Sequence, residues 1–214
     1  MEREKIIEAI KKARDGKERK FKQTLDLVIN LKGLDLKKPE NRIKAEIFLP
    51  KGIGKKPKIG IFADSLIPAV NKLEDADVIL IRKDKIEDYS RDKKAGKKMA
   101  SECHAFLAEA PLMPMVGKSL GQVLAPRNKM PKPIPPTIPN LKPVVERTRN
   151  TVRINLKDSP VIYCGVGKED MGDEILAENI EAVLKAVETG LPRGKEQIRE
   201  IIVKLTMGKP VKIE

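Results

Sequence analysis

The sequence predicts a mixed α/β and α+β protein of two domains, one of which is split by the other. Segments near both ends alternate between apolar and polar residues, as strands that bury a single face do. The central part instead holds short continuous apolar runs separated by helical stretches, a pattern typical of parallel strands joined by crossover helices. Residues 50–57 lie between the two patterns and are rich in glycine, proline and lysine, which indicates a boundary.

The first segment is expected to form a helix and two strands. Residues 4–14 place apolar side chains at helical spacing. Residues 21–31 alternate and put Leu25 and Leu27 on one face, so they predict a strand. Residues 43–49 alternate as well, and we expect them to pair with this first strand as a hairpin.

The central segment is expected to form a parallel sheet with helices between its strands. We expect strands at 59–63, 78–81 and 105–108 and helices at 67–73 and 141–149. The proline-rich residues 131–139 cannot form a helix and are expected to run extended.

Alternation returns from Thr151 onward. We expect strands at 152–156, 161–166 and 198–205, and a helix at 173–188 that Gly190 and Pro192 terminate. An inserted domain explains this order, because chain ends that enter and leave a surface loop can lie close together. The predicted fold is a split α+β domain of residues 1–55 and 150–214, with residues 56–149 inserted as a Rossmann-like three-layer α/β domain.

The composition points to an anionic partner. The chain has 44 basic and 31 acidic residues and a formal net charge of +13, which favours nucleic acid first and acidic membrane surfaces second. Aromatic residues make up 3% of the chain and include no tryptophan, so a row of rings that stacks on single-stranded bases is not expected. Contacts to the backbone, sugars and shape of a folded RNA fit this composition better.

The chain is expected to be a cytoplasmic protein without a membrane segment. No apolar stretch approaches the ~18 residues that span a bilayer, and the charged N-terminal residues do not resemble a signal peptide. The two cysteines, Cys103 and Cys164, form no disulfide framework and are expected to stay reduced.

The sequence offers no complete set of catalytic or metal-binding residues. Gly117-Lys118-Ser119 is similar to the end of a phosphate-binding P-loop, but Leu112 stands where that loop needs glycine, so a helix or turn is expected. Cys103 and His104 could be metal ligands, yet His104 is the single histidine and a zinc site needs three or four ligands. We therefore expect a binding protein without a cofactor, a metal or an enzymatic activity. The alternatives are a P-loop-like nucleotide-using enzyme and a free, sequence-tolerant RNA chaperone.

The end of the last predicted strand is the first candidate binding site. It leads into Thr206-Met207-Gly208, which combines a hydroxyl, a soft apolar surface and a residue that lets a backbone approach closely. Lys204 shares a strand face with Thr206, and Gly167-Lys168 at the end of another strand could add a cation. The alternative is a strand followed by a glycine turn.

Phe21 is the second candidate. It follows Lys20 in a basic stretch and opens the first predicted strand. Its parity with Leu25 predicts that it packs inward, whereas an aromatic side chain at the end of a sheet could contact RNA instead. Spacing alone leaves both interpretations open.

Three blocks of sequence carry a family resemblance. They are Lys20 to Thr24, Gly117 to Pro133, and Thr206-Met207-Gly208. Together they resemble the L1 family of large-subunit ribosomal proteins in its archaeal form, and the similarity extends over essentially the whole chain. The middle block departs from the common bacterial pattern at Ala125, where glycine is usual, and at Asn128 to Met130.

The resemblance implies a structural constituent of the large ribosomal subunit that binds large-subunit rRNA at the mobile stalk. It also implies release of deacylated tRNA from the exit site and repression of translation through binding of the protein's own mRNA. The family's RNA site lies in the split domain, and the free protein is expected to be a monomer. The RNA-binding residues predicted from spacing and from the resemblance are Lys20, Phe21, Thr24, Gly167, Lys168, Lys204, Thr206, Met207 and Gly208.

Overall fold

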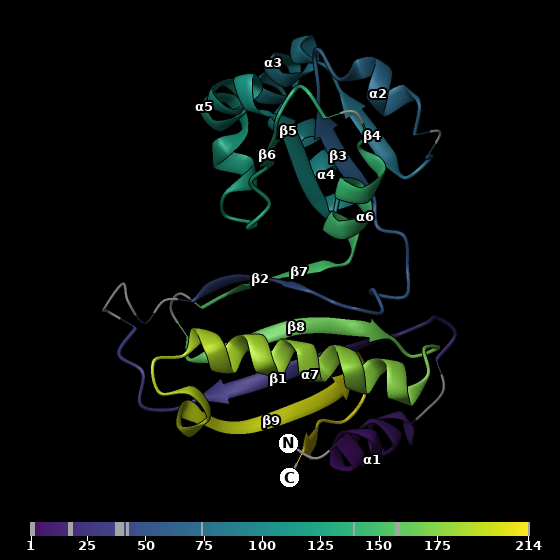
Figure 1. The fold of residues 1–214 in the computed structure, drawn as a ribbon, viewed down its shortest axis with the longest axis vertical. Coiled ribbons are helices and arrows are strands. Elements are labelled where there is room, and N and C mark those ends of the chain that lie inside the picture. Colours follow the sequence, from purple (N-terminus) through teal and green to yellow (C-terminus); the bar gives the residue numbers. More distant parts are fainter. Residues whose placement is uncertain are drawn as a thin grey trace. The chain divides into compact units, whose positions relative to one another are not determined.

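The computed structural model describes residues 3–16, 19–36, 41, 43–73, 75–138, 140–156 and 159–213. The chain contains both helices and strands, and the strands form several sheets. The prediction of a mixed α/β protein is therefore confirmed (Figure 1). Internal contacts divide the chain into two compact units. We call residues 1–55 with 150–214 the terminal unit and residues 56–149 the middle unit, and each is described by itself.

The terminal unit is built on a four-stranded antiparallel sheet. Its strand order is β10 (Val211–Ile213), β9 (Ile198–Leu205), β1 (Thr24–Leu31) and β8 (Val161–Lys168). Helices α1 (Arg3–Arg14) and α7 (Asp173–Gly190) bury their apolar sides against one face of this sheet, and Figure 1 shows α7 lying across the strands. That face carries the alternating apolar residues of β1, such as Leu25 and Leu27, which are fully buried. The 3-10 turn η3 (Gly194–Gln197) leads into β9.

The prediction that the first two strands pair as a hairpin is wrong. Strand β2 (Lys44–Phe48) pairs with β7 (Thr151–Asn155) in a separate two-stranded antiparallel sheet. Both edges of β1 are already occupied by β8 and β9. The chain returns at Asn150 close to the place where it left, because the amide of Leu49 donates to the carbonyl of Asn150 at 2.8 Å. Alternation predicted the strand correctly but could not choose its partner.

The middle unit is a parallel four-stranded sheet between two helical layers. Its strand order is β4 (Val78–Ile81), β3 (Ile59–Phe62), β5 (Ala105–Glu109) and β6 (Lys132–Ile134), and every pairing is parallel. The continuous apolar runs predicted this for β3, β4 and β5, whereas the segment that holds β6 was expected only to run extended. Helices α3 (Lys83–Arg91), α4 (Lys93–Glu102) and α5 (Met113–Leu124) share one apolar core with the sheet. Helices α2 (Ile67–Asn71) and α6 (Lys142–Arg149) share the other. The 3-10 turn η2 (Ala110–Leu112) precedes α5.

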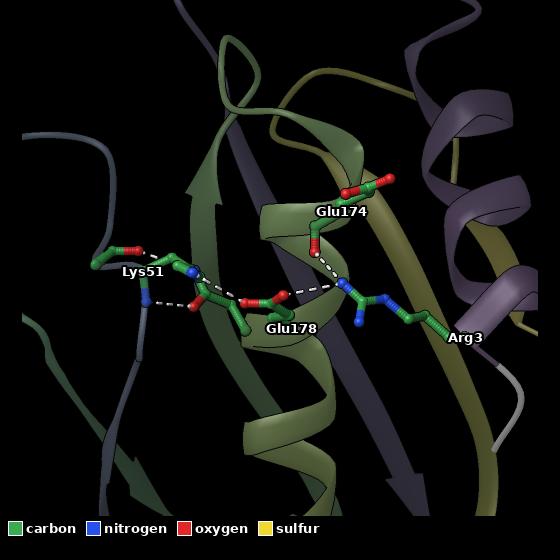
Figure 2. A network of polar contacts seen from close by, with 6 residues as sticks. Arg3, Lys51, Glu174 and Glu178 are labelled. Atoms are coloured by element: carbon green, nitrogen blue, oxygen red, sulfur yellow. Dashed lines mark hydrogen bonds and ion pairs between the residues drawn. The ribbon is translucent and has the colours of Figure 1, made fainter.

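Helix α7 holds the segment through which the chain leaves the terminal unit. Figure 2 shows Glu178 between Arg3 and Lys51, with Nη2 of Arg3 at 3.0 Å and Nζ of Lys51 at 3.5 Å from its carboxylate. The guanidinium of Arg3 also donates to the carbonyl of Glu174 at 3.4 Å. These ion pairs lie at the surface, where such pairs add little stability.

Asn179, the next residue on α7, is fully buried and holds the same segment by hydrogen bonds. Its Nδ2 donates to the carbonyls of Gly52 and Val166, both at 2.9 Å, and its Oδ1 accepts from the amide of Lys51 at 3.2 Å. Val166 is the extra residue of a β-bulge, because Leu25 pairs with Gly167 while the next residue of β1 pairs with Gly165. A bulge leaves its extra residue outside the ladder, and Asn179 satisfies that carbonyl.

Gly52 must be glycine for two reasons. Its φ is +69°, a conformation that residues with a side chain rarely adopt. A Cβ there would also lie 2.9 Å from the side-chain oxygen of Asn150. The glycine-rich boundary predicted from sequence is therefore required by a tight turn against the returning chain.

The two cysteines are buried in different cores. Burial raises the pKa of the Cys103 thiol to about 11 and the pKa of the Cys164 thiol to about 12. Both thiols therefore stay protonated at pH 8, and a protonated thiol is a poor nucleophile. We expect the folded protein to resist iodoacetamide at this pH and the guanidinium-unfolded protein to react at both positions, as mass spectrometry would show. Rapid modification of the folded chain would contradict this assignment.

Candidate nucleic-acid interface

One end of the terminal unit's sheet brings together three segments that are far apart in sequence. Thr24, the first residue of β1, pairs with Lys168, the last residue of β8. Leu25 pairs with Leu205, the last residue of β9. The start of β1 and the ends of β8 and β9 therefore meet, and the predicted residues that they carry or adjoin gather there. We call this region the sheet end.

Thr206 continues the pairing beyond the last residue of β9. Its amide donates to the carbonyl of Thr24 at 3.0 Å, and its hydroxyl lies 3.1 Å from the same carbonyl. In return, the amide of Thr24 donates to the Thr206 hydroxyl at 3.3 Å. The hydroxyl is thus engaged inside the protein although the residue is exposed. It fixes the turn that presents Met207 and retains limited hydrogen-bonding capacity for a ligand.

Met207 is held by its backbone and exposes its side chain. Its amide donates to Oε1 of Gln23 at 3.0 Å, whereas 59% of the residue is exposed. Gln23 is buried, and its carbonyl accepts from the amide of Glu169 at 3.1 Å. It therefore joins all three segments. Gln23 was not among the predicted binding residues, although its parity with Leu25 indicated that it points inward.

Phe21 does not pack inward, because β1 begins only at Thr24. The alternation therefore does not extend to Phe21, which is 54% exposed next to the exposed Lys20. Neighbouring Lys22 places its Nζ 2.6 Å from Oδ2 of Asp170. An aromatic ring and a thioether, both largely exposed, thus flank the start of β1 and the end of β9.

Lys168 is a positioned cation. It is half-buried, and its Nζ donates to the hydroxyl of Thr24 at 3.0 Å and to the carbonyl of Lys22 at 3.3 Å. Gly167 beside it is buried, and a Cβ there would lie 2.4 Å from Cδ2 of Leu176 on α7. The absence of a side chain at Gly167 is therefore required by packing beneath the helix.

Gly208 is half-buried and closes the turn after β9, where its amide donates to the carbonyl of Leu205 at 2.8 Å.

Asp26 and Tyr163 lie near this region and were not among the predicted binding residues. Asp26 is 5% exposed, lies opposite Lys204 in the sheet, and places Oδ2 3.5 Å from the Thr206 hydroxyl. Burial of the Tyr163 hydroxyl and its hydrogen bond to Asp26 raise the pKa of Tyr163 to about 12. Lys204 itself is half-buried. A carboxylate in mid-strand gives little signal in the sequence, because a solvated acidic residue would occupy the same position in the pattern.

The middle unit offers little to a nucleotide. Gly117-Lys118-Ser119 lies inside α5, which confirms the expected helix, and a helix interior has no free amides to wrap a phosphate. Open α/β sheets bind ligands at the carboxyl ends of their strands. There, the buried carboxylate of Glu109 accepts from the amides of Asp64 and Leu66, at 2.8 and 2.6 Å. The protein's own anion thus occupies these donors.

Two further observations concern metal binding and membrane insertion. Among the residues that the structure describes, no three His, Cys, Asp or Glu side chains come together as metal ligands. None of the helices in the described ranges is both long and apolar enough to span a bilayer.

Comparisons with known proteins identify the family of the chain. The profile of the Ribosomal protein L1p/L10e family matches residues 10–209. Large ribosomal subunit protein uL1 of Thermococcus kodakarensis is 46% identical over 214 residues, covering 100% of this chain and 98% of its own. The protein of the same name from Methanothermococcus thermolithotrophicus is 48% identical over 215 residues and is covered completely on both sides. The chain belongs to the ribosomal protein L1 family.

Proposed function

We propose that the protein binds large-subunit rRNA through the sheet end of its terminal unit, as a structural and non-enzymatic component. Family membership makes it a protein of the large ribosomal subunit, and hence a cytoplasmic, ribosome-associated protein. The observation that carries the proposed site is the convergence of Phe21, Lys168 and Met207 at one end of one sheet. Two exposed apolar side chains beside a positioned cation suit sugars, base edges and phosphates.

The test is binding of the purified chain to purified large-subunit rRNA, with small-subunit rRNA as competitor. Selective retention of large-subunit rRNA, lost on Met207→Ala with Phe21→Ala, is the expected result. Equal affinity for both RNAs would favour the free RNA chaperone instead. Ile175→Ala removes an exposed apolar side chain of α7 and is the matched control.

We infer that the same sheet end binds a similar structure in the protein's own mRNA and so represses translation. The support is that one preformed surface can accept any RNA that reproduces the rRNA structure. Competition between the two RNAs for one site tests this inference. We further infer that the protein assists release of deacylated tRNA from the exit site. If so, ribosomes that lack the protein should release this tRNA more slowly. The free protein is inferred to be a monomer.

The Thr206 hydroxyl should matter for both folding and RNA binding. Thr206→Val keeps the shape and the backbone bond to Thr24 but removes the two bonds that the hydroxyl makes with Thr24, so we expect a stability loss of about 1 kcal/mol. RNA affinity should fall by a further 1–3 kcal/mol, roughly, because the turn that presents Met207 loosens. Thr189→Val is the matched control, since it removes a hydroxyl that donates to a backbone carbonyl near the other end of α7. If the two variants bind RNA with equal affinity, Thr206 does not belong to the RNA-binding site.

Lys204 should act through phosphate charge. Lys204→Gln is expected to flatten the slope of log affinity against log salt by about one released counterion, whereas Thr206→Val should leave that slope unchanged. Salt titrations of both variants provide the measurement. An unchanged slope for Lys204→Gln would show that this lysine serves only the sheet.

A further inference from the structure

The sheet of the terminal unit has one face that the helices do not cover. Helices α1 and α7 pack on the face of Leu25 and Leu27. The opposite face, which we call the open face, carries the alternate residues of the same strands. It includes Asp26 and Val28 of β1, Tyr163 and Gly165 of β8, Ile202 and Lys204 of β9, and Lys212 of β10.

Tyr163 is the most exposed large hydrophobic side chain in the part of the chain that the structure describes, at 60%. Its hydroxyl is close enough to Asp26 for that carboxylate to contribute to its raised pKa. A tyrosine ring has few rotatable bonds and offers a large rigid surface, which favours its use as a contact.

The register of the sheet places Asp26 between Tyr163 and the sheet end. Tyr163 pairs with Val28, whereas Asp26 pairs with Gly165, so Asp26 is a diagonal neighbour one row closer to Thr24. Aromatic side chains can reach diagonal neighbours in an antiparallel pair. Asp26 in turn lies 3.5 Å from the Thr206 hydroxyl. Asp26 thus lies between the row of Tyr163 and the turn that presents Met207.

The charges of the open face suit a polyanion. Lys204 stands opposite Asp26, and Lys212 lies opposite Ile202 in the row that contains Val28 and Tyr163. The two carboxylates of this face have partners within the protein. Asp26 lies 3.5 Å from the Thr206 hydroxyl, and Glu200 accepts from Asn30 at 2.6 Å and pairs with Lys212 at 2.7 Å. Repulsion of a phosphate backbone by these acids is therefore reduced. Lys204 lies opposite Asp26 and Lys168 opposite Thr24, in the rows between Tyr163 and the sheet end.

We propose that Tyr163 is a stacking platform for one unpaired base, so that the RNA interface extends from the sheet end over the open face. This inference rests on the proposed function and names its mode of recognition. A row of aromatic platforms is missing from the chain, but one ring suits a single splayed-out base of a folded RNA. A double helix would not offer a base face to the ring, so the occupant is an unpaired nucleotide.

Intrinsic fluorescence gives a direct test, because the chain has two tyrosines and no tryptophan. Tyr89→Phe leaves Tyr163 as the only emitter, and Tyr163→Phe leaves Tyr89 of α3 in the middle unit as the matched reporter. Both proteins are titrated with the same purified large-subunit rRNA, so its absorption affects both alike. Stacking should quench Tyr163 well beyond Tyr89. Equal changes in the two proteins would overturn the proposal.

Affinity supplies the second readout. Tyr163→Ala should weaken rRNA binding by about 5- to 150-fold, the range that loss of one stacked base produces, with an unchanged salt slope. Tyr163→Phe keeps the ring and should bind like the parent. Phe48→Ala is the control, since it removes an exposed ring from β2 in the other sheet of the unit.

The outcomes separate the two proposals. A parent protein that does not bind large-subunit rRNA contradicts the proposed function itself. A parent that binds, together with Tyr163→Ala of equal affinity and no excess quenching, overturns only the stacking inference. If Tyr163→Ala does not fold in a urea titration, the fluorescence of the Tyr89→Phe protein decides alone.

Discussion

Phe106→Ala should cost the middle unit about 3–5 kcal/mol of stability, the usual result of emptying a fully buried aromatic position. The ring of Phe106 packs against Phe62 with centroids 5.7 Å apart. It also lies so close to Gly60 that a Cβ there would sit 2.5 Å from it. Few neighbouring atoms can move in to fill the space. Because domains have stabilities of about 5–15 kcal/mol, this loss removes much of the total.

The same variant tests where the RNA site lies. If RNA binds to the terminal unit alone, the affinity for large-subunit rRNA should be nearly unchanged while the middle unit becomes unstable. Urea unfolding monitored by amide hydrogen exchange would report the stability of each unit separately. Phe48→Ala is the control for loss of an exposed ring. A loss of RNA affinity beyond about a hundredfold, or 3 kcal/mol, with the terminal unit still protected would show that both units form the site.

Asn179→Ala should be the most damaging polar substitution in the terminal unit. It would leave the carbonyls of Gly52 and Val166 and the amide of Lys51 without their partner. Each buried group left unpaired costs about 1–3 kcal/mol, and water entering the space offsets a part, so a total of roughly 3 kcal/mol is expected. The carbonyl of Val166 matters for function as well, because the bulge leads directly into Gly167 and Lys168 at the sheet end.

Urea unfolding and amide exchange measure this effect. Exchange should accelerate around Gly52 and in the last residues of β8. Glu178→Gln is the matched control on the adjacent residue, since it weakens only the surface contacts with Arg3 and Lys51 and should change stability far less. If the two variants are equally stable, Asn179 does not carry the structural role that its burial indicates.

Many elements of this fold could be predicted from the sequence, because their signals are local. The apolar spacing of residues 173–188 predicted α7, which runs from Asp173 to Gly190. The continuous apolar runs predicted that β3, β4 and β5 are parallel. In contrast, β1 begins at Thr24 and not at Phe21, and β10 was not expected at all. Strand ends are poorly marked because neither burial nor alternation changes sharply there.

The candidate site was predicted less completely than the fold. The structure brings Thr24, Lys168 and Thr206 together as contacting residues. Gln23, Asp26 and Tyr163 were missed, since their importance depends on partners in other strands. A polar residue in a strand has the same appearance in the sequence whether it faces water or closes a buried network. RNA contact by any of these residues stays a prediction.

The sequence by itself determined the spacing of apolar residues in the helices and strands and the net charge of +13. It also placed glycine at positions 52 and 54, where φ is positive. These properties depend on side chains a few positions apart or on composition. Only the tertiary structure decided that β2 pairs with β7, that Phe21 is exposed, and that Asn179 closes a bulge in β8. Pairing of distant segments depends on which edges and carbonyls remain unsatisfied once the sheet has formed, and local spacing carries no record of that competition.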